Sequence, residues 1–307
     1  MSKLAPTRFP RAALLTGIAC LSAVALSSSH AADAARPDFA PNPGVGWVAA
    51  SRVFMAPPGG GAGPVVDDPS HRGASNDDFR NSGAQPTFPM ADLSNPILQP
   101  WVRQKLKEHN DRVLAGKAAF AARASCWPTG VPAFLLFPIM PIFIIQGPKE
   151  VLMVWQADNA QFRRIYLNEK HSANVKPSWY GESIGHYEGN TLVVDTVGID
   201  TRTVVDDYET PHTEKLHVVE RFRLINGDNT LEVNLRVEDP GAFTMPWNAV
   251  QRFNRVEPGR AENRDPFNAV LSATKAGPLL EAICAENSGG HFVNDTQPIP
   301  QATKSDF

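Results

Sequence analysis

The hairpin that decides the fold is encoded at residues 215–238, which read KLHVVERFRLINGDNTLEVNLRVE. Apolar and polar residues alternate on both sides of Asn226-Gly227-Asp228-Asn229. Such a turn between two alternating segments is a strong signal for a hairpin of antiparallel strands. We therefore predict strands at 215–225 and 230–238. One face of the second strand is entirely apolar, with Leu231, Val233, Leu235 and Val237.

Strand patterns continue on both sides of this hairpin. Short turns separate them, and no segment between them has the length of a crossover helix, so we expect an antiparallel sheet. A succession of hairpins favours an up-and-down barrel of the lipocalin type, with a β-sandwich as the alternative. The other strands are predicted at residues 142–146, 151–155, 162–167, 182–187, 191–197 and 249–256.

Prolines mark the limits of this mainly β region. The chain has 307 residues and 27 prolines, and 4 of these prolines lie in residues 151–257. Because proline is excluded from central strands, the regular core is expected there. Residues 32–93 are predicted to be an irregular arm rich in proline and glycine. A helix at 96–116, with Ser94 as its N-cap, is predicted to join the barrel in one domain at 94–290, before a C-terminal tail at 291–307.

The first 31 residues have the pattern of a secretory signal peptide. Lys3, Arg8 and Arg11 precede an apolar stretch at 12–26, and small residues at Ser29 and Ala31 suit cleavage after Ala31. We therefore expect a periplasmic or secreted protein, with no membrane span in the mature chain.

Charge excludes one class of partner. Residues 1–31 hold three basic and no acidic side chains, so the remainder has 26 Lys and Arg against 32 Asp and Glu. No run of basic residues is present in that remainder, which argues against binding nucleic acid or an anionic membrane surface.

Two cysteines remain after the signal segment, Cys126 before the strands and Cys284 after them. In an exported protein an even number of cysteines suggests a disulfide, and two buried free thiols are the alternative.

Acidic residues within apolar strand faces are the first candidates for chemistry. Glu220 falls in the apolar row of its strand, and Asp195 shares a face with Val193 and Val197. A carboxylate that faces the interior must pair or shift its pKa, so each is a candidate acid or base, and an ion pair with arginine is the structural alternative. His186 and His212 are the candidate catalytic bases that Asp195 or Glu220 would orient.

Aromatic and basic residues at the ends of the strands are candidates for ligand binding. Trp179 and Trp247 are expected either to line the mouth of the barrel or to plug it. Neither a metal site nor a cofactor is predicted, because His212, Glu214 and His217 have no recognised metal-ligand spacing. The full set of predicted binding residues is Trp179, Tyr187, His217, Arg221 and Trp247.

The segment 179–196 also resembles a family signature, W-x-G-x-S-x-G-x-[WY]-E-G-[DN]-T-L-V-V-D-T. It includes Gly181-Glu182-Ser183-Ile184-Gly185, but the helix that follows the nucleophile in an α/β-hydrolase is missing. The chain resembles a large group of exported bacterial proteins that have no assigned activity. The resemblance therefore implies export and supplies no catalytic residues.

Together these patterns predict an exported β-barrel that binds a small apolar or aromatic molecule. The alternative is a cofactor-independent lyase, isomerase or hydrolase that uses a histidine–carboxylate pair in the barrel cavity. A third interpretation is a structural protein whose arms bind elsewhere. Limited proteolysis separates the third from the others, because arms that are clipped without loss of the core would suit it.

Overall fold

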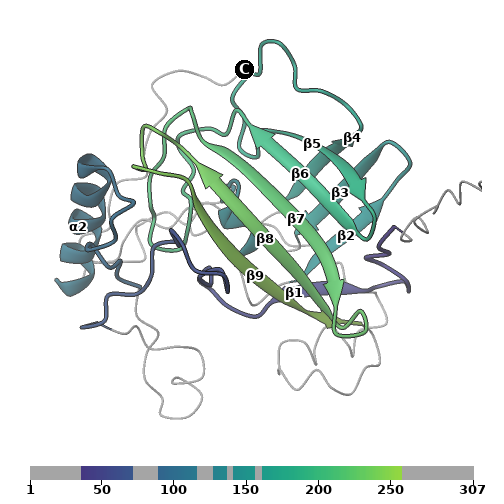
Figure 1. The fold of residues 1–307 in the computed structure, drawn as a ribbon, viewed down its shortest axis with the longest axis horizontal. Coiled ribbons are helices and arrows are strands. Elements are labelled where there is room, and N and C mark those ends of the chain that lie inside the picture. The colour runs from purple at the N-terminus through teal and green to yellow at the C-terminus, as the bar shows by residue number, and fades with distance from the viewer. Residues whose placement is uncertain (1–35, 72–88, 116–126, 137–140, 156–160, 258–307) are drawn as a thin grey trace, which may run out of the picture. The chain divides into compact units, whose positions relative to one another are not determined.

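Nine strands form a closed barrel in the computed structural model of the chain (Figure 1). The structure describes residues 36–71, 89–115, 127–136, 141–155 and 161–257. The predicted signal segment, Cys126, Cys284 and the tail at 291–307 lie outside these residues, as does the predicted disulfide. The strands are β1 Gly46–Ala49, β2 Ile142–Gln146, β3 Glu150–Trp155, β4 Phe162–Leu167, β5 Glu182–Glu188, β6 Thr191–Val197, β7 His217–Ile225, β8 Thr230–Glu238 and β9 Trp247–Val256.

All eight predicted strands are confirmed, and the observed ends differ from the predicted ones by two residues or fewer. The β7–β8 hairpin has the expected turn, since Asn226, Gly227 and Asp228 all adopt positive φ angles of 54°, 59° and 62°. Asparagine, glycine and aspartate tolerate this left-handed backbone better than other residues. The apolar row of β8 is buried, as its alternation predicted.

One pair of strands is parallel, contrary to the prediction of a wholly antiparallel sheet. β4 pairs with β5 in parallel over three residue pairs, from Ile165–Ser183 to Leu167–Gly185. The connection at 168–181 carries the chain from the end of β4 back to the other end of the sheet before β5 begins. The remaining neighbours in the barrel are antiparallel, including β9 with β1.

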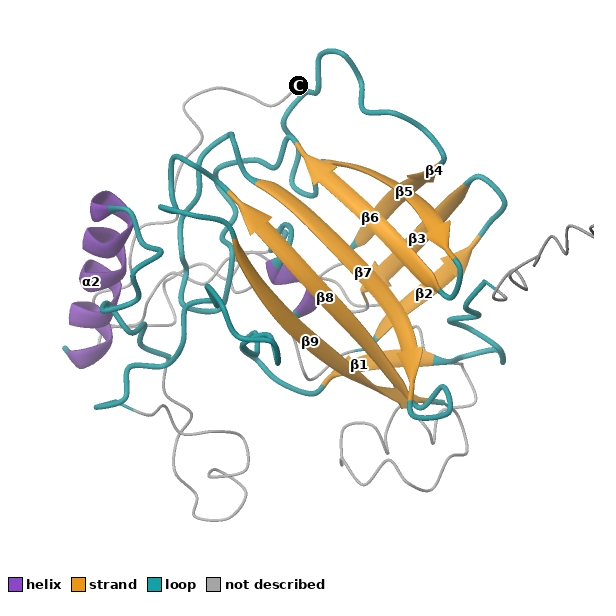
Figure 2. Cartoon of the chain, viewed as in Figure 1, coloured by secondary structure: helices purple, strands orange, loops and turns teal. Residues whose placement is uncertain are grey.

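The predicted irregular arm supplies the strand that closes the barrel (Figure 2). β1 pairs with β9 over four residues and with β2 at Trp47–Ile142. The indole of Trp47 is buried and donates a hydrogen bond of 2.9 Å to the carbonyl of Phe39, which is itself buried. Part of the arm therefore belongs to the core, and the rest of its described residues wrap the barrel.

Buried aromatic side chains pack around a short 3₁₀ helix. Phe134, from the short 3₁₀ helix Ala133–Leu135, packs edge-on against Trp155 and Tyr180, with ring centroids 6.2 and 5.5 Å apart. Phe134 and Trp155 are each 1% exposed, so almost none of their surface is accessible to water. Gln251, which is fully buried, donates to the carbonyl of Leu135 and fixes this helix to β9.

One α-helix, α2 Pro100–Leu114, lies beside the barrel among the described residues (Figure 2). It begins later than predicted, because Pro100 occupies the first helical position and Gln99, instead of Ser94, precedes it. Val102 and Leu106 face the protein and are buried. No helix in the described ranges is long and apolar enough to cross a membrane.

Candidate functional site

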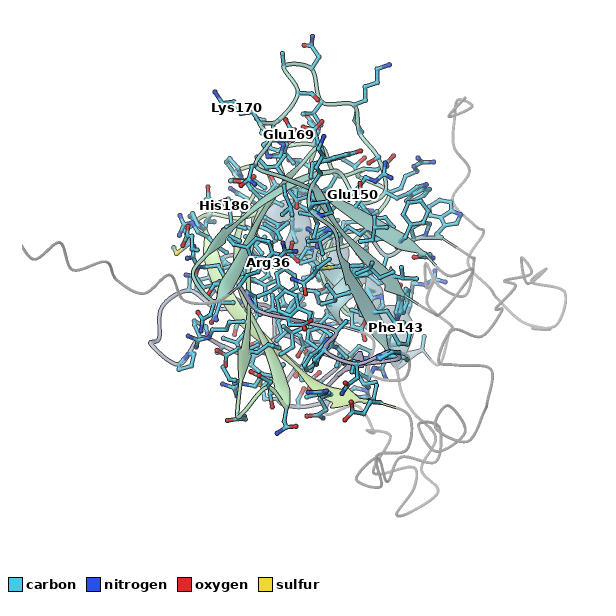
Figure 3. All side chains as sticks on the ribbon, turned by 90° about the vertical axis from the view of Figure 1, so that its right-hand side faces the viewer. Arg36, Phe143, Glu150, Glu169, Lys170 and His186 are labelled. Atoms are coloured by element: carbon cyan, nitrogen blue, oxygen red, sulfur yellow. The ribbon has the colours of Figure 1, made fainter. Side chains whose placement is uncertain are left out.

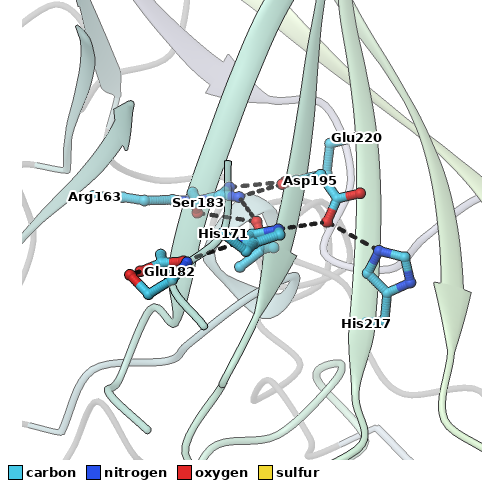
Figure 4. Close-up of polar contacts among 9 residues, drawn as sticks. Arg163, His171, Glu182, Ser183, Asp195, His217 and Glu220 are labelled. Carbon is cyan, nitrogen blue, oxygen red and sulfur yellow. Dashed lines mark hydrogen bonds and ion pairs between the residues drawn. The ribbon is translucent and has the colours of Figure 1, made fainter. Parts of the chain in front are cut away.

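A buried polar cluster lies inside the barrel, where β4, β5, β6 and β7 each contribute one side chain (Figure 4). Arg163 on β4 and Glu220 on β7 form a bidentate ion pair, with an Nη1–Oε1 distance of 2.9 Å. Arg163 also donates through Nε to Ser183 at 3.1 Å and through Nη2 to Thr196 at 2.8 Å. The four side chains are 0–1% exposed.

This cluster confirms that Glu220 faces inward, and it selects the structural alternative of an ion pair with arginine. Both carboxylate oxygens accept hydrogen bonds from Arg163, so Glu220 is not poised to transfer a proton. Ser183 lies within β5 and bonds Arg163, which rules out the exposed position that a nucleophile elbow needs.

A second polar cluster lies on the outer face of the same strands, and we call it the outer row (Figure 4). It runs from Glu182 on β5 through His171 and Asp195 to His217 on β7. His171 bonds Glu182 through Nδ1 and Asp195 through Nε2, both at 3.0 Å. His217 Nε2 reaches the same Asp195 oxygen at 3.0 Å. Imidazoles and carboxylates therefore alternate along the row.

The position of Asp195 corrects the sequence analysis. Its side chain is 38% exposed and lies on the outer face, whereas Leu192, Val194 and Thr196 of the same strand face the interior. β6 is apolar on both faces, so its alternation does not identify the inner one. His217 and Glu220 lie on opposite faces of β7, as their spacing predicts.

Hydrogen bonding dominates the electrostatics of the outer row. Partial burial raises the pKa of Asp195, but hydrogen bonds from His217 and His171 outweigh burial and leave the pKa lowered. The hydrogen bond to Asp195 raises the pKa of His217. Hydrogen bonds from the hydroxyl and backbone N–H of Ser172 lower the pKa of Glu182. These hydrogen bonds thus favour the ionised carboxylates of Asp195 and Glu182 and the protonated imidazole of His217.

An aromatic pair lies at the end of the barrel where β5 begins and β6 ends. The rings of Trp127 and Trp179 are 5.3 Å apart with an interplanar angle of 57°. The guanidinium of Arg202 lies 4.2 Å from the Trp179 ring and forms a bidentate pair with Asp200, at 3.0 and 2.7 Å. Both indoles are partly exposed. We call Trp127, Trp179 and Arg202 the rim site.

His212 lies close to the rim but apart from the predicted carboxylates. It is 4% exposed, its Nδ1 lies 2.9 Å from the Thr213 carbonyl, and its Nε2 lies 2.9 Å from the Thr203 hydroxyl. Burial lowers the pKa of His212. These contacts hold the connection between β6 and β7 in place.

The remaining predicted residues are spread over the barrel. His186 and Arg221 lie on the outer face, where both bond Glu188, and Figure 3 shows His186 on that surface. The hydroxyl of Tyr187 accepts a hydrogen bond from Gln146, and the Arg36 guanidinium lies 4.3 Å from its ring. Trp247 is 1% exposed and packs against Phe54 and Phe243, which fits a plug.

The structure therefore brings Asp195 and His217 together and keeps His186, His212 and Glu220 apart from them and from one another. No histidine–carboxylate pair lies inside the barrel among the described residues. Nor does any group of three or more His, Cys, Asp or Glu in these ranges have the arrangement of a metal site. Comparisons with protein-family models, curated proteins and solved structures find no significant match for this chain.

Arg163, His171, Trp127 and Arg202 are among the residues of these sites that the sequence patterns did not predict. Arg163 had a signal, because it shares a strand face with Ile165 and Leu167 in the predicted strand 162–167. An arginine on the apolar face of one strand and a glutamate on the apolar face of another suggest a buried ion pair between them. His171 and Trp127 carried no such signal, since both lie in irregular segments whose course depends on the assembled barrel.

Proposed function

We propose that this chain is an exported β-barrel protein that binds a small apolar or aromatic molecule at the rim site. On this proposal it belongs to the exported bacterial group whose signature it resembles at 179–196, and the mature chain begins after Ala31 in the periplasm or outside the cell. The barrel fold supports the proposal because barrels present loops on a rigid scaffold, where ligand contacts are commonly placed.

The observation that carries the proposal is the contact between Trp127 and Trp179, two partly exposed indoles beside a cation. Indoles offer large flat apolar surfaces with little conformational freedom to lose, so they favour stacking with a planar ligand. Arg202 is held by Asp200, and its guanidinium lies over the ring of Trp179. Planar aromatic molecules are therefore the expected ligand class.

The interior of the barrel is the less suitable location. Phe134 and Trp155 are buried against each other, Trp47 is buried as well, and the Arg163–Glu220 pair joins β4 to β7. A ligand there would have to displace packed side chains or separate a fully buried ion pair.

Titration with the fluorescent aromatic anion anilinonaphthalene sulfonate tests the rim site. Saturable binding is expected, and Trp179→Ala should weaken it by about tenfold or more, as truncation of an aromatic anchor does. Phe162→Ala is the matched control, because Phe162 is 63% exposed on the outer face of β4. Loss of binding in Phe162→Ala, or unchanged binding in Trp179→Ala, would overturn the assignment.

Export is tested separately. The full chain expressed in a Gram-negative host should appear in the periplasmic fraction with Ala32 as its first residue, measured by intact mass. Retention of residues 1–31 in a cytoplasmic product would contradict export.

A further inference from the structure

The outer row attaches the first part of the connection at 168–181 to the barrel, and backbone hydrogen bonds of Ser178 with Gly198 and Asp200 attach its last part. Its His171 ring spans Glu182 and Asp195, and the Ser172 hydroxyl and N–H both donate to Glu182, the backbone bond at 2.7 Å. Figure 3 shows Glu169 and Lys170 at one extremity of the described structure, where this connection extends beyond the strands. The same connection ends in Trp179, half of the rim aromatic pair.

The hydrogen bonds of His171 depend on its protonation. Both ring nitrogens lie 3.0 Å from carboxylate oxygens, Glu182 on one side and Asp195 on the other. A doubly protonated ring donates to both, whereas a neutral ring has a single N–H and leaves a lone pair facing the other carboxylate. A neutral His171 ring therefore makes one hydrogen bond fewer to these two carboxylates than the doubly protonated ring.

We propose that the outer row is a proton-binding site that holds residues 168–181 against the barrel and thereby sets the affinity of the rim site for its ligand. The proton-binding site is inferred from the geometry of the row alone. Its effect on the affinity of the rim site rests on the proposed function. The charged groups that face the row are Glu182 from β5, Asp195 from β6, and Arg236 and Glu238 from β8, which act on His217 with opposite signs.

The direction of the effect follows from the shifts. The raised pKa of His217 contributes stability that is complete below its ordinary value of 6.5 and is lost as the pH rises through the folded value. The lowered pKa values of Asp195 and Glu182 contribute stability above their ordinary values of 3.8 and 4.5. The shifts therefore make the outer row most stable between about pH 4.5 and pH 6.5, and it loses stability as the pH rises further.

Amide hydrogen exchange of residues 168–181 in the mature chain tests the proton site without any ligand. After correction for intrinsic rates, protection should fall on the order of threefold between about pH 5.5 and about pH 7.5, the effect of a partly exposed ion pair. His171→Gln and Asp195→Asn should abolish this dependence. Glu150→Gln, which breaks the exposed pair with Arg164 on another part of the barrel, should retain it.

The binding assay separates the two halves of the proposal. Affinity for anilinonaphthalene sulfonate should decrease about as much as protection does over the same pH range. In Asp195→Asn, the affinity should not depend on pH in this range. Protection that does not change with pH in the wild type, or that still changes in both row variants, would overturn the proton site. If protection changes with pH but no saturable binding occurs, the proposed function fails and the proton site stands.

Discussion

Arg163 and Glu220 pair across the interior of the barrel from β4 and β7, two strands that are not neighbours in the sheet. Between them lie β5 and β6, each of which adds a hydroxyl to the same guanidinium. Four strands are thus joined by one side chain. The pair cross-links the strands of the barrel from the inside. This role explains why two charged residues lie on strand faces that are otherwise apolar.

Breaking this pair should destabilise the protein strongly. Glu220→Gln leaves the Arg163 charge buried without its counter-ion, which costs about 3–5 kcal/mol in the free energy of unfolding. The double variant Arg163→Met, Glu220→Leu removes both charges, and Ser183 and Thr196 keep each other as partners at 2.9 Å. Urea unfolding should therefore show the double variant to be more stable than Glu220→Gln.

The control for this prediction is Arg164→Met on the same strand. Arg164 forms a pair with Glu150 in which both side chains are exposed, at 49% and 37%. Its loss should change stability by less than about 1 kcal/mol. An equal cost for the buried and exposed variants would contradict the role given to Arg163.

Asp206 should make stability depend on pH. It is 3% exposed, and burial raises its pKa to about 6 despite hydrogen bonds from Thr210 and Tyr208. Because the folded state binds this proton more tightly, the contribution is complete below 3.8 and is lost as the pH rises through about 6. Relative to Asp206→Asn, the wild type should lose about 2 kcal/mol between pH 4 and pH 7. Urea unfolding across this range measures the difference. If the free energy of unfolding changes equally with pH in both proteins, the prediction is wrong.

Phe134→Ala should create a cavity that binds a small apolar ligand. Removal of the buried ring costs about 3–5 kcal/mol and leaves an apolar space beside Trp155 and Tyr180. Benzene should raise the melting temperature of this variant and leave that of the wild type unchanged. A matching rise in the wild type would show that its interior is already hollow.

Trp47→Ala should show that the arm is part of the fold. Its side chain is 1% exposed in the closing strand, and truncation is expected to cost about 3–5 kcal/mol. Trp101 on α2 is 41% exposed, and Trp101→Ala should cost less than about 1 kcal/mol. Thermal unfolding of the two variants distinguishes the contributions, and similar losses would argue against a core role for β1.

The strands were predictable because alternation and turn residues are local properties, and the β7–β8 hairpin contains both. β1 was not, since four residues within a proline-rich segment carry no periodicity of their own and their partners lie on β9 and β2. The inner face of β6 was assigned wrongly because Val193 and Val197 make its outer face apolar as well. The outer row depended on His171, whose position is set by the course of residues 168–181 and by no local pattern.

The pairing of β1 with β9 joins the first described strand to the last. A ribosome makes Gly46–Ala49 long before Trp247–Val256, so the wall of the barrel cannot close until synthesis has passed β9. A contact of such large sequence separation also forms slowly. Under the proposed export the chain crosses a membrane before it folds, and this delay keeps its leading segment extended until β9 has emerged on the far side.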